Sequence, residues 1–199
     1  MSWVELKNEY TLITKKAQEK KPFLKNWIRF TELVNKSSEK PPLAMETLIS
    51  SLKKLEINKK KNQITIFDHG CGAGLKAMYL AALGYKNVYG VDVGEVNYIN
   101  ILLKKIFNIN EQRFLKTDGK RVPFKNSKFD FIISSQVVEH LKEEHIYTYY
   151  QEEGRLLKKN GLVYHEVPHL FMPYEAHTRL WLIHLLPYFF KPFLYAVVQ

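Results

Sequence analysis

The chain has 199 residues and a mass of 23.5 kDa, enough for one well-buried domain and too little for two ordinary ones. Its residues are 46% hydrophobic and 25% charged, which excludes a disordered, collagen-like or low-complexity protein. The single cysteine cannot form an internal disulfide, and the first ten residues carry charges where a signal peptide needs an apolar run. We therefore expect one domain, residues 1–199, in the reducing cytoplasm.

The positive charge of the chain is concentrated near its start. The formal net charge is +10 at pH 7, and residues 1–62 hold 14 basic against 7 acidic side chains. Such an excess is typical of a solvated, lysine-rich surface, and less often of a surface for nucleic acid or an anionic membrane. We favour the solvated surface, although the sequence does not exclude nucleic acid as a partner.

Residues 1–62 have the apolar spacing of helices. Apolar side chains recur every three to four residues, as at Trp27 and Phe30. The polar and proline-rich segment 37–42 interrupts this pattern, and a second helical stretch covers Leu43–Leu55. We expect these N-terminal helices to flank a core.

From residue 63 the pattern changes to short apolar runs that alternate with longer helical ones. The expected strands are 64–67, 88–91, 113–115, 129–133 and 162–164. The expected helices between them are 75–83, 96–107 and 138–157, the last ended by Asn160-Gly161. This alternation predicts an α/β fold, a Rossmann-like, doubly wound, mostly parallel sheet with helices on both faces. Residues 63–169 form this core, and ligands bind at the carboxyl ends of such strands.

A glycine-rich turn joins the first expected strand to the helix that follows. The turn reads Asp68-His69-Gly70-Cys71-Gly72-Ala73-Gly74, and its glycines allow a sharp turn and the close approach of a ligand. A dinucleotide-binding turn needs a further glycine where this chain has Leu75. Asp68 at the strand end repels a diphosphate and attracts a cation. The turn therefore favours a positively charged ligand without phosphates.

Carboxylates also follow the second and third expected strands. Asp92 ends the second, where an acid can accept hydrogen bonds from both hydroxyls of a ribose. Asp118, followed by Gly119, comes after the third, where a carboxylate can accept a hydrogen bond from the exocyclic amine of adenine. Each acid alone is equally consistent with a turn or a helix N-cap. Three acids after three successive strands predict a nucleoside site.

Several segments of this core together resemble the class I S-adenosylmethionine-dependent methyltransferases, in particular the small-molecule group called type 11. The segments are Ile66–Gly74, Val91–Asp92, Lys116–Gly119 with Val122–Phe124, and Phe129–Leu141. The resemblance implies S-adenosylmethionine as cofactor and S-adenosylhomocysteine as product. The cofactor-binding residues that it implies are Asp68, Gly70, Cys71, Gly72, Gly74, Asp92, Val93, Asp118, Gly119, Ser135 and Gln136. His69 is larger and more polar than the residue often found in that family's turn.

Methyl transfer from a sulfonium is an in-line displacement, in which the protein aligns the acceptor and takes up a proton if the acceptor is a hydroxyl. No metal is required for this displacement, and we expect no metal site. His140, after the fourth strand, is our first choice of base, and His177 in the polar stretch 173–179 is a second. The other candidates are Glu139, His165, Glu166, His169, Tyr174 and Glu175. For Glu139 and His140 the alternative is a role at the start of a helix.

Residues 170–199 form an apolar C-terminal segment. Residues 180–199 are nearly uncharged, but Pro187 and Pro192 argue against a simple membrane span. The sequence leaves open a lid over the substrate side, peripheral contact with the inner membrane surface, or an interior segment. The two further strands of a complete class I sheet are not evident before residue 199, and apolar surface exposed in their place would favour a homodimer.

The leading hypothesis is S-adenosylmethionine-dependent methyl transfer to a small-molecule, glycan or lipid-linked acceptor, at a hydroxyl. The stretch 173–187 faintly resembles methyltransferases of surface-polysaccharide and lipid-glycan biosynthesis, which favours the last two acceptors. Methylation of RNA is an alternative that the net charge favours, although the tetrapeptide that clamps nucleobases in amino-group methylation is missing after the fourth strand. A cofactor-binding scaffold without activity is a third hypothesis.

Overall fold

The computed structural model describes residues 24–36, 43–167, 174–175 and 180–181. The chain divides into two compact units, residues 1–165 and residues 166–199. The expectation of one domain over the whole chain stays a prediction. His169, His177 and most of the apolar C-terminal segment lie outside the described residues, so the roles expected for them also stay predictions.

Helices and strands alternate through the first unit, as the sequence predicts. The helices are α2 (Leu24–Lys36), α3 (Leu43–Glu56), α4 (Leu75–Ala82), α5 (Asn97–Phe107) and α6 (Glu143–Leu156), with the 3-10 turns η1 (Lys61–Gln63) and η2 (Val138–His140). The strands are β1 (Thr65–His69), β2 (Asn87–Asp92), β3 (Phe114–Lys116), β4 (Phe129–Ser135) and β5 (Leu157–Glu166). The first four expected strands are confirmed, with ends that differ by one or two residues.

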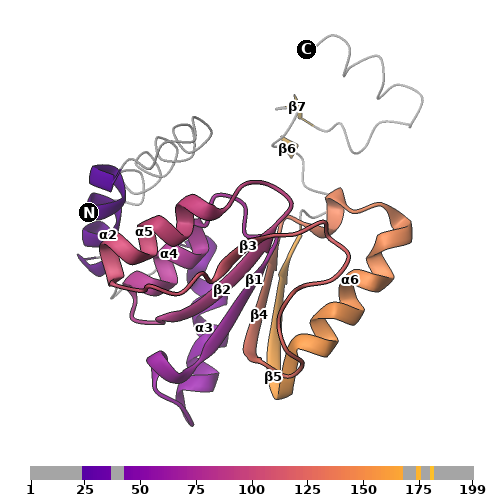
Figure 1. Cartoon of the computed structure of the whole chain (residues 1–199), viewed down its shortest axis with the longest axis horizontal. Coiled ribbons are helices and arrows are strands. Elements are labelled where there is room, and N and C mark those ends of the chain that lie inside the picture. Colours follow the sequence, from indigo (N-terminus) through magenta and orange to yellow (C-terminus); the bar gives the residue numbers. More distant parts are fainter. Residues whose placement is uncertain (1–23, 37–42, 168–173, 176–179, 182–199) are drawn as a thin grey trace. The chain divides into compact units, whose positions relative to one another are not determined.

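The strands form one sheet in the order β3-β2-β1-β4-β5 (Figure 1). β1 pairs in parallel with β2 and with β4, and β2 pairs in parallel with β3. The chain builds outward from β1 to β3 and then crosses to the other side of β1 for β4 and β5. This reversal leaves a crevice at the carboxyl ends of β1 and β4. The doubly wound α/β fold is therefore confirmed.

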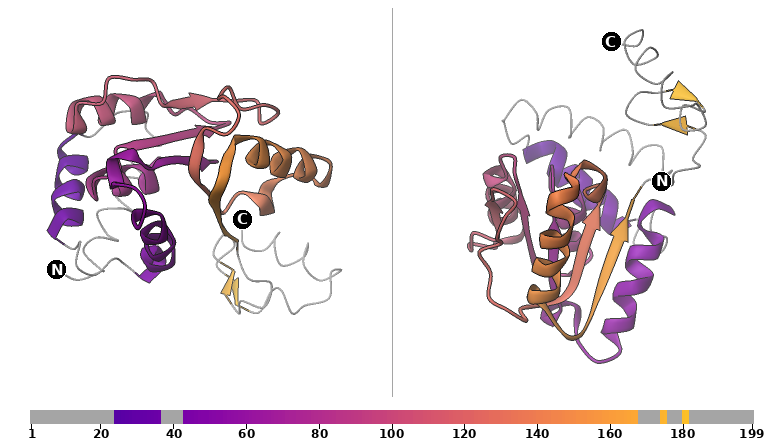
Figure 2. Two further views of the ribbon diagram at one scale, coloured as in Figure 1. Left: turned by 90° about the horizontal axis from the view of Figure 1, so that it is seen from below. Right: turned by 90° about the vertical axis from the view of Figure 1, so that its right-hand side faces the viewer.

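Helices cover both faces of the sheet (Figures 1 and 2). On one face, buried residues of α2, α3, α4 and α5 pack with Ile66 of β1 and Ile133 of β4. On the other face, Leu156 of α6 packs with Phe67 of β1 and Ile132 of β4. Because successive strand residues point to opposite faces, neighbours such as Ile66 and Phe67 belong to different cores. The central strands are therefore apolar on both sides, as is typical of covered parallel sheets.

The helix expected over residues 138–157 is interrupted in the structure. η2 ends before Leu141, whose backbone is extended, and α6 begins after Lys142, which is also extended. Glu143 and Glu144 occupy the first turn of α6, where carboxylates interact favourably with the positive end of the helix dipole. The expectation of one continuous helix is therefore wrong, and His140 lies in the connection between β4 and α6.

The Asn160-Gly161 pair does not end a helix, contrary to the sequence-based expectation. α6 ends at Leu156 and β5 begins at Leu157, so the pair lies inside the strand. Asn160 has a φ of 65°, a left-handed backbone that Asn tolerates better than most residues. A Cβ on Gly161 would lie 2.7 Å from Leu157 Cδ1, so a larger residue would clash there. The pair is therefore part of β5, with one left-handed residue.

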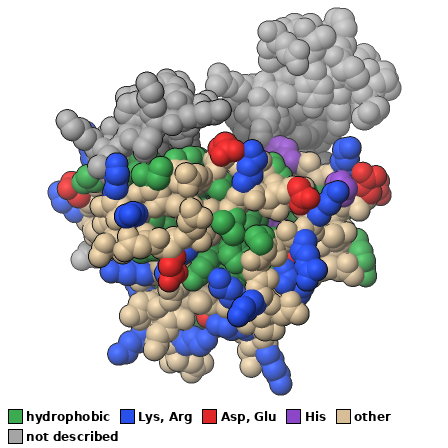
Figure 3. Space-filling model, viewed as in Figure 1, with side chains coloured by type: hydrophobic (Ala, Val, Ile, Leu, Met, Phe, Trp, Pro, Cys, Tyr) green, Lys and Arg blue, Asp and Glu red, His purple; other side chains and the backbone are tan. Residues whose placement is uncertain are grey.

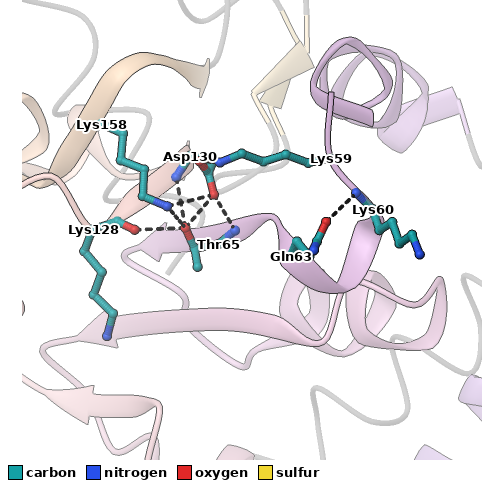
Figure 4. A network of polar contacts seen from close by, with 7 residues as sticks. All are labelled: Lys59, Lys60, Gln63, Thr65, Lys128, Asp130 and Lys158. Carbon is teal, nitrogen blue, oxygen red and sulfur yellow. Dashed lines mark hydrogen bonds and ion pairs between the residues drawn. The ribbon is translucent and has the colours of Figure 1, made fainter. Parts of the chain in front are cut away.

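A polar cluster joins the amino ends of β1, β4 and β5 (Figure 4). Asp130 of β4 accepts hydrogen bonds from Lys59 Nζ (2.5 Å), Thr65 N (2.9 Å) and Lys158 Nζ (3.1 Å), and the Thr65 hydroxyl lies 2.7 Å from its carboxylate. Burial raises the pKa of Asp130, but these hydrogen bonds outweigh burial and lower the pKa to about 2. Asp130 is therefore an ionised carboxylate whose partners all come from within the chain.

Lysines gather at this same amino edge of the sheet. The lysines at or just before the starts of the strands are Lys59, Lys60, Lys61, Lys86, Lys125, Lys128, Lys158 and Lys159. Figure 3 shows that the charged side chains over the lower half of the view, where the strands begin, are mostly Lys and Arg. The basic excess that the sequence places mainly in residues 1–62 is therefore shared with later segments of the chain.

The described part of the second unit contains two short strands, β6 (Tyr174–Glu175) and β7 (Leu180–Trp181). They pair with each other in antiparallel fashion, as a sheet separate from that of β1–β5. None of the helices that the structure describes combines the length and the apolar character needed to cross a membrane. Peripheral membrane contact through residues 180–199 and the homodimer stay predictions.

Candidate functional site

A cavity of about 570 Å³ lies at the carboxyl ends of β1, β2 and β4. Its size falls within the range of small-molecule sites, about 300–1,000 Å³. Its walls come from the turn after β1, the start of α4, the end of β2, the loop after β3 and the segment Ser135–Leu141, while Tyr149 of α6 completes the lining. The cavity therefore occupies the crevice that the strand order creates.

The glycine turn after β1 is held against the end of β2. Gly70 N donates to the Val91 carbonyl oxygen (3.0 Å), and Gly72 N donates to Asp92 Oδ2 (2.7 Å). Gly70 has a φ of 84°, and a Cβ there would lie 2.5 Å from Val137 Cγ2. A Cβ on Gly72 would meet nothing within 4 Å. Packing against Val137 therefore explains the glycine at position 70, whereas the space beside Gly72 is available to a ligand.

Asp92 is a carboxylate whose position is set by backbone donors. Its Oδ2 accepts the hydrogen bond from Gly72 N, and its Oδ1 accepts one from Gly94 N at 2.8 Å. Each oxygen has a second lone pair, so both can also accept hydrogen bonds from the two hydroxyls of a ribose. The exposed apolar side chain of Val93 lines the cavity beside it. This arrangement suits a nucleoside, with the ribose at Asp92 and the base near Val93.

Asp68 is the buried acid of the cavity, with only 3% of its surface exposed. Burial raises the pKa of Asp68 from 3.8 to about 7; the positive charge of Lys76 opposes this rise and the nearby Asp92 adds to it. Such a carboxyl group ionises most readily when a cation binds beside it. Asp68 therefore fits the positively charged ligand that the sequence predicts.

Lys76 is a cavity residue that the sequence analysis did not identify. It lies in the first turn of α4, and its Nζ donates a hydrogen bond to Ser135 Oγ at 2.7 Å, which joins α4 to the end of β4. A lysine here can also pair with a carboxylate of a bound ligand. Lys76 could have been predicted from the sequence, because it lies directly after the glycine turn, in the first turn of a helix.

Most of the predicted cofactor-binding residues line this cavity. Those that do are Asp68, Gly70, Cys71, Gly72, Asp92, Val93, Gly119, Ser135 and Gln136, together with the predicted base His140. Burial, with the charges of Asp68 and Asp92, raises the pKa of the Cys71 thiol well above its usual range, so Cys71 lines the cavity as a neutral thiol. The fold therefore brings together residues from the ends of β1, β2, β3 and β4.

Other predicted residues are placed differently. Gly74 has a φ of 72°, and a Cβ there would lie 2.6 Å from Ile99 Cδ1, so this glycine is needed where the turn packs on α5. Asp118 is exposed and does not line the cavity; its Oδ1 accepts a hydrogen bond from Lys120 N at 3.0 Å. Its contact with an adenine amine stays a prediction, as does the role of His177, which lies outside the described residues.

A buried group of polar side chains borders the cavity on the α6 side of the sheet. His69 Nδ1 lies 3.2 Å from Glu153 Oε1, and His165 Nε2 lies 2.9 Å from Glu153 Oε2. The Tyr149 ring stacks on the His69 ring with centroids 3.8 Å apart, and the Tyr149 hydroxyl lies 2.9 Å from Ser134 Oγ. Over the part of the chain that the structure describes, no group of His, Cys, Asp and Glu side chains is arranged to hold a metal ion.

Glu153 and Tyr149 were not identified from the sequence. Both lie, with Leu156, on the buried face of α6. Glu153 could have been predicted from the sequence as a carboxylate on the core-facing side of a helix. Such a residue is informative because buried acids require polar partners. His165, an expected candidate on the fifth strand, is held by Glu153.

Sequence comparisons identify a family and several relatives. Residues 67–165 match the family described as "Methyltransferase domain". The ubiquinone biosynthesis O-methyltransferase of Pelagibacter ubique is 32% identical over 123 residues, which cover 60% of this chain and 48% of that protein. The protein of the same name from Bartonella tribocorum is 28% identical over 103 residues, which cover 52% of this chain and 40% of the relative. The chain thus spans about half the length of the curated relatives it matches, or less.

Solved structures that are similar to this chain include a SAM-dependent methyltransferase from Aquifex aeolicus. It is 18% identical, with a TM-score of 0.49, and the match covers 83% of this chain and 87% of that one. The 1,6-didemethyltoxoflavin-N1-methyltransferase of Burkholderia thailandensis, solved with bound S-adenosylhomocysteine, is 22% identical with a TM-score of 0.44, over 50% of this chain and 42% of that one.

Proposed function

The chain belongs to the class I S-adenosylmethionine-dependent methyltransferases, and from this premise we propose that it methylates a hydroxyl group of a small-molecule acceptor. The cofactor supplies an electrophilic methyl group on a sulfonium. The residues of this chain have to bind the nucleoside, orient the acceptor and accept the hydroxyl proton.

The contact between Asp92 and the glycine turn carries this proposal. Backbone donors hold both oxygens of Asp92 before any ligand binds, so little conformational entropy is lost when a ribose binds there. Gly72 leaves open space beside this carboxylate, and Asp68 supplies a buried acid for the positive charge of the methionine part. Lys76 suits the methionine carboxylate. The described residues therefore fit S-adenosylmethionine.

Two observations favour a hydroxyl acceptor. Curated relatives that match half of this chain are named O-methyltransferases. His69 and His140 also line the cavity, and their imidazole groups can accept a proton. Methylation of a glycan, a lipid-linked acceptor or RNA is kept as an outcome of the test.

Calorimetric titration with S-adenosylmethionine and S-adenosylhomocysteine tests the binding part of the proposal. We expect both to bind, and Asp92→Asn to raise Kd by about 100-fold because two charge-assisted hydrogen bonds, worth roughly 1.5–3 kcal/mol each, are weakened. Glu111→Gln is the matched control, since Glu111 is exposed and pairs with Arg113 away from the cavity. Absence of binding in the wild type would contradict the proposal.

Turnover on a panel of acceptors tests the reaction. Phenols, catechols, sugar hydroxyls and a short RNA are incubated with the wild type and radiolabelled S-adenosylmethionine, and the labelled atom is identified. Methylation of a small-molecule hydroxyl is expected. Methylation confined to RNA, or cofactor binding without turnover on any member of the panel, would instead favour one of the alternative functions.

A further inference from the structure

We propose that His69 is the general base of the reaction, with Glu153 as the residue that positions it. This inference rests on the proposed hydroxyl methylation and names the proton acceptor within it. The sequence-based choices for the base, His140 and His177, lie in other segments of the chain.

The first step is the tautomer of His69. Glu153 is 3% exposed, and its two oxygens face His69 Nδ1 at 3.2 Å and His165 Nε2 at 2.9 Å. A carboxylate oxygen accepts a hydrogen bond, so in both contacts the ring nitrogen is the donor. A neutral imidazole has one N–H and one free lone pair. The contact therefore leaves the lone pair of His69 on Nε2.

The second step is the position of that lone pair. No hydrogen bond joins His69 Nε2 to a described residue. His69 is one of the residues that line the cavity. With Nδ1 engaged by Glu153, Nε2 is the ring nitrogen left to face the cavity.

The third step is rigidity. The Tyr149 ring lies parallel to the His69 ring, with an angle of 4° between them and centroids 3.8 Å apart. The Tyr149 hydroxyl bonds to Ser134 Oγ of β4 (2.9 Å) and lies 3.1 Å from the His69 carbonyl oxygen. Stacking on the Tyr149 ring thus fixes the plane of the His69 imidazole, and the contact of Nδ1 with Glu153 fixes its rotation within that plane. A base held in this way loses little entropy when the acceptor binds.

The chemistry balances with these groups alone. As the acceptor oxygen forms its bond to the methyl carbon, the bond from that carbon to sulfur breaks and its electron pair stays on sulfur as a neutral thioether. The hydroxyl proton passes to His69 Nε2. The imidazolium that results lies against the Glu153 carboxylate, which stabilises its charge in a buried setting. Release of the proton to solvent completes the cycle.

Kinetics of matched variants test the base. We expect His69→Gln to lower kcat by 100-fold or more, the usual contribution of a general base, while Kd for S-adenosylmethionine stays within three-fold of wild type. Glu153→Gln should lower kcat about ten-fold, with KM for the acceptor little changed. His145→Gln and Glu144→Gln are the controls, because both residues are exposed in the first turn of α6 and pair with each other. The two controls should retain wild-type kcat.

A spectroscopic readout keeps the test independent of how the variants fold. Nitrogen NMR of the ¹⁵N-histidine-labelled wild type reports which ring nitrogen of His69 carries the proton. We expect the proton on Nδ1 in the wild type and a mixture of tautomers in Glu153→Gln. A proton on Nε2 in the wild type, or a His69→Gln variant that binds the cofactor and retains kcat within three-fold, would overturn the inference. A wild type that binds the cofactor but methylates no hydroxyl overturns the proposed function, and the base role with it.

Discussion

Asp68 and Asp130 are two buried aspartates at opposite edges of the same sheet, with 3% and 5% of their surfaces exposed. Their acidities nevertheless move in opposite directions. The pKa of Asp68, at the carboxyl edge, rises to about 7, whereas that of Asp130, at the amino edge, falls to about 2. Burial raises the pKa in both places, but at Asp130 the hydrogen bonds from Lys59, Thr65 and Lys158 outweigh it.

Asp130 has its partners within the chain. Lys59, Thr65 and Lys158 surround it, and its charge is stabilised in the folded protein without any ligand (Figure 4). Burial dominates at Asp68, although Lys76 lowers its pKa in part. A buried carboxylate satisfied by its own chain contributes to the fold, and one left largely uncompensated beside a cavity is suited to a cationic ligand.

Asp68→Asn should have the largest effect of the changes that test this contrast. We expect Kd for S-adenosylmethionine to rise by at least 100-fold, because the amide cannot neutralise the cationic methionine part. The free energy of unfolding of the ligand-free protein should increase at pH 8, by roughly 2–4 kcal/mol, since ionised Asp68 destabilises the fold above its raised pKa. Calorimetry and urea unfolding measure the two effects. A variant that is less stable than wild type at pH 8 would contradict this account.

Asp130→Asn should do the opposite. The pKa of Asp130 is lowered from 3.8 to about 2, so its ionised form stabilises the fold at pH 7 by about 2 kcal/mol. This contribution is present above pH 4 and is lost as the pH falls toward 2. Urea unfolding at pH 7 and pH 3 should therefore show a smaller difference from wild type at the lower pH. Cofactor affinity should remain within two-fold; a large loss of affinity would show that the two edges are coupled.

The pH dependence of cofactor binding should follow Asp68. With a pKa of about 7 in the free protein, Asp68 is mostly protonated at pH 6 and mostly ionised at pH 8. Because the cationic ligand favours the ionised form, affinity should increase about ten-fold from pH 6 to pH 8 and then level off. Calorimetry across this range checks the slope. The same series on Asp68→Asn should be flat, and an equal slope in that variant would assign the titration to another group.

Single changes of the lysines around Asp130 should have the smallest effects. The side chains of Lys59 and Lys158 are 41% and 34% exposed, and ion pairs of such residues are screened by water. We expect Lys59→Gln or Lys158→Gln to cost less than about 1 kcal/mol, because the other donors to Asp130 remain. The double variant should cost more than the two single changes together, as measured by urea unfolding in a double-mutant cycle.

The arrangement of elements was predictable from local patterns, but some of their ends were not. The strand from Phe129 was evident because its residues are apolar on both faces, as in a covered parallel strand. The start of α6 depends on the extended backbone of Leu141 and Lys142, which neither residue type signals. At Asn160-Gly161 a turn signal was present, but the pair lies inside β5, with Asn160 in the left-handed region.

The acids and glycines that line the cavity were predictable, whereas the contacts of His69 were not. Asp68 and Asp92 each follow a strand, and the parallel sheet brings such positions to one edge. Glu153 meets His69 across 84 residues of chain, through the packing of α6 on the sheet. No local pattern encodes that contact.

The order and spacing of the residues determined a doubly wound sheet that brings the glycine turn, Asp68 and Asp92 to its carboxyl edge, because strand periodicity and glycine turns act over a few residues. Only the tertiary structure decided which buried carboxylate is neutralised within the chain and which carboxylate pairs with His69. Both outcomes depend on donors contributed by distant segments, and electrostatic interactions in a low-dielectric interior depend on distances in space and not on separation along the chain.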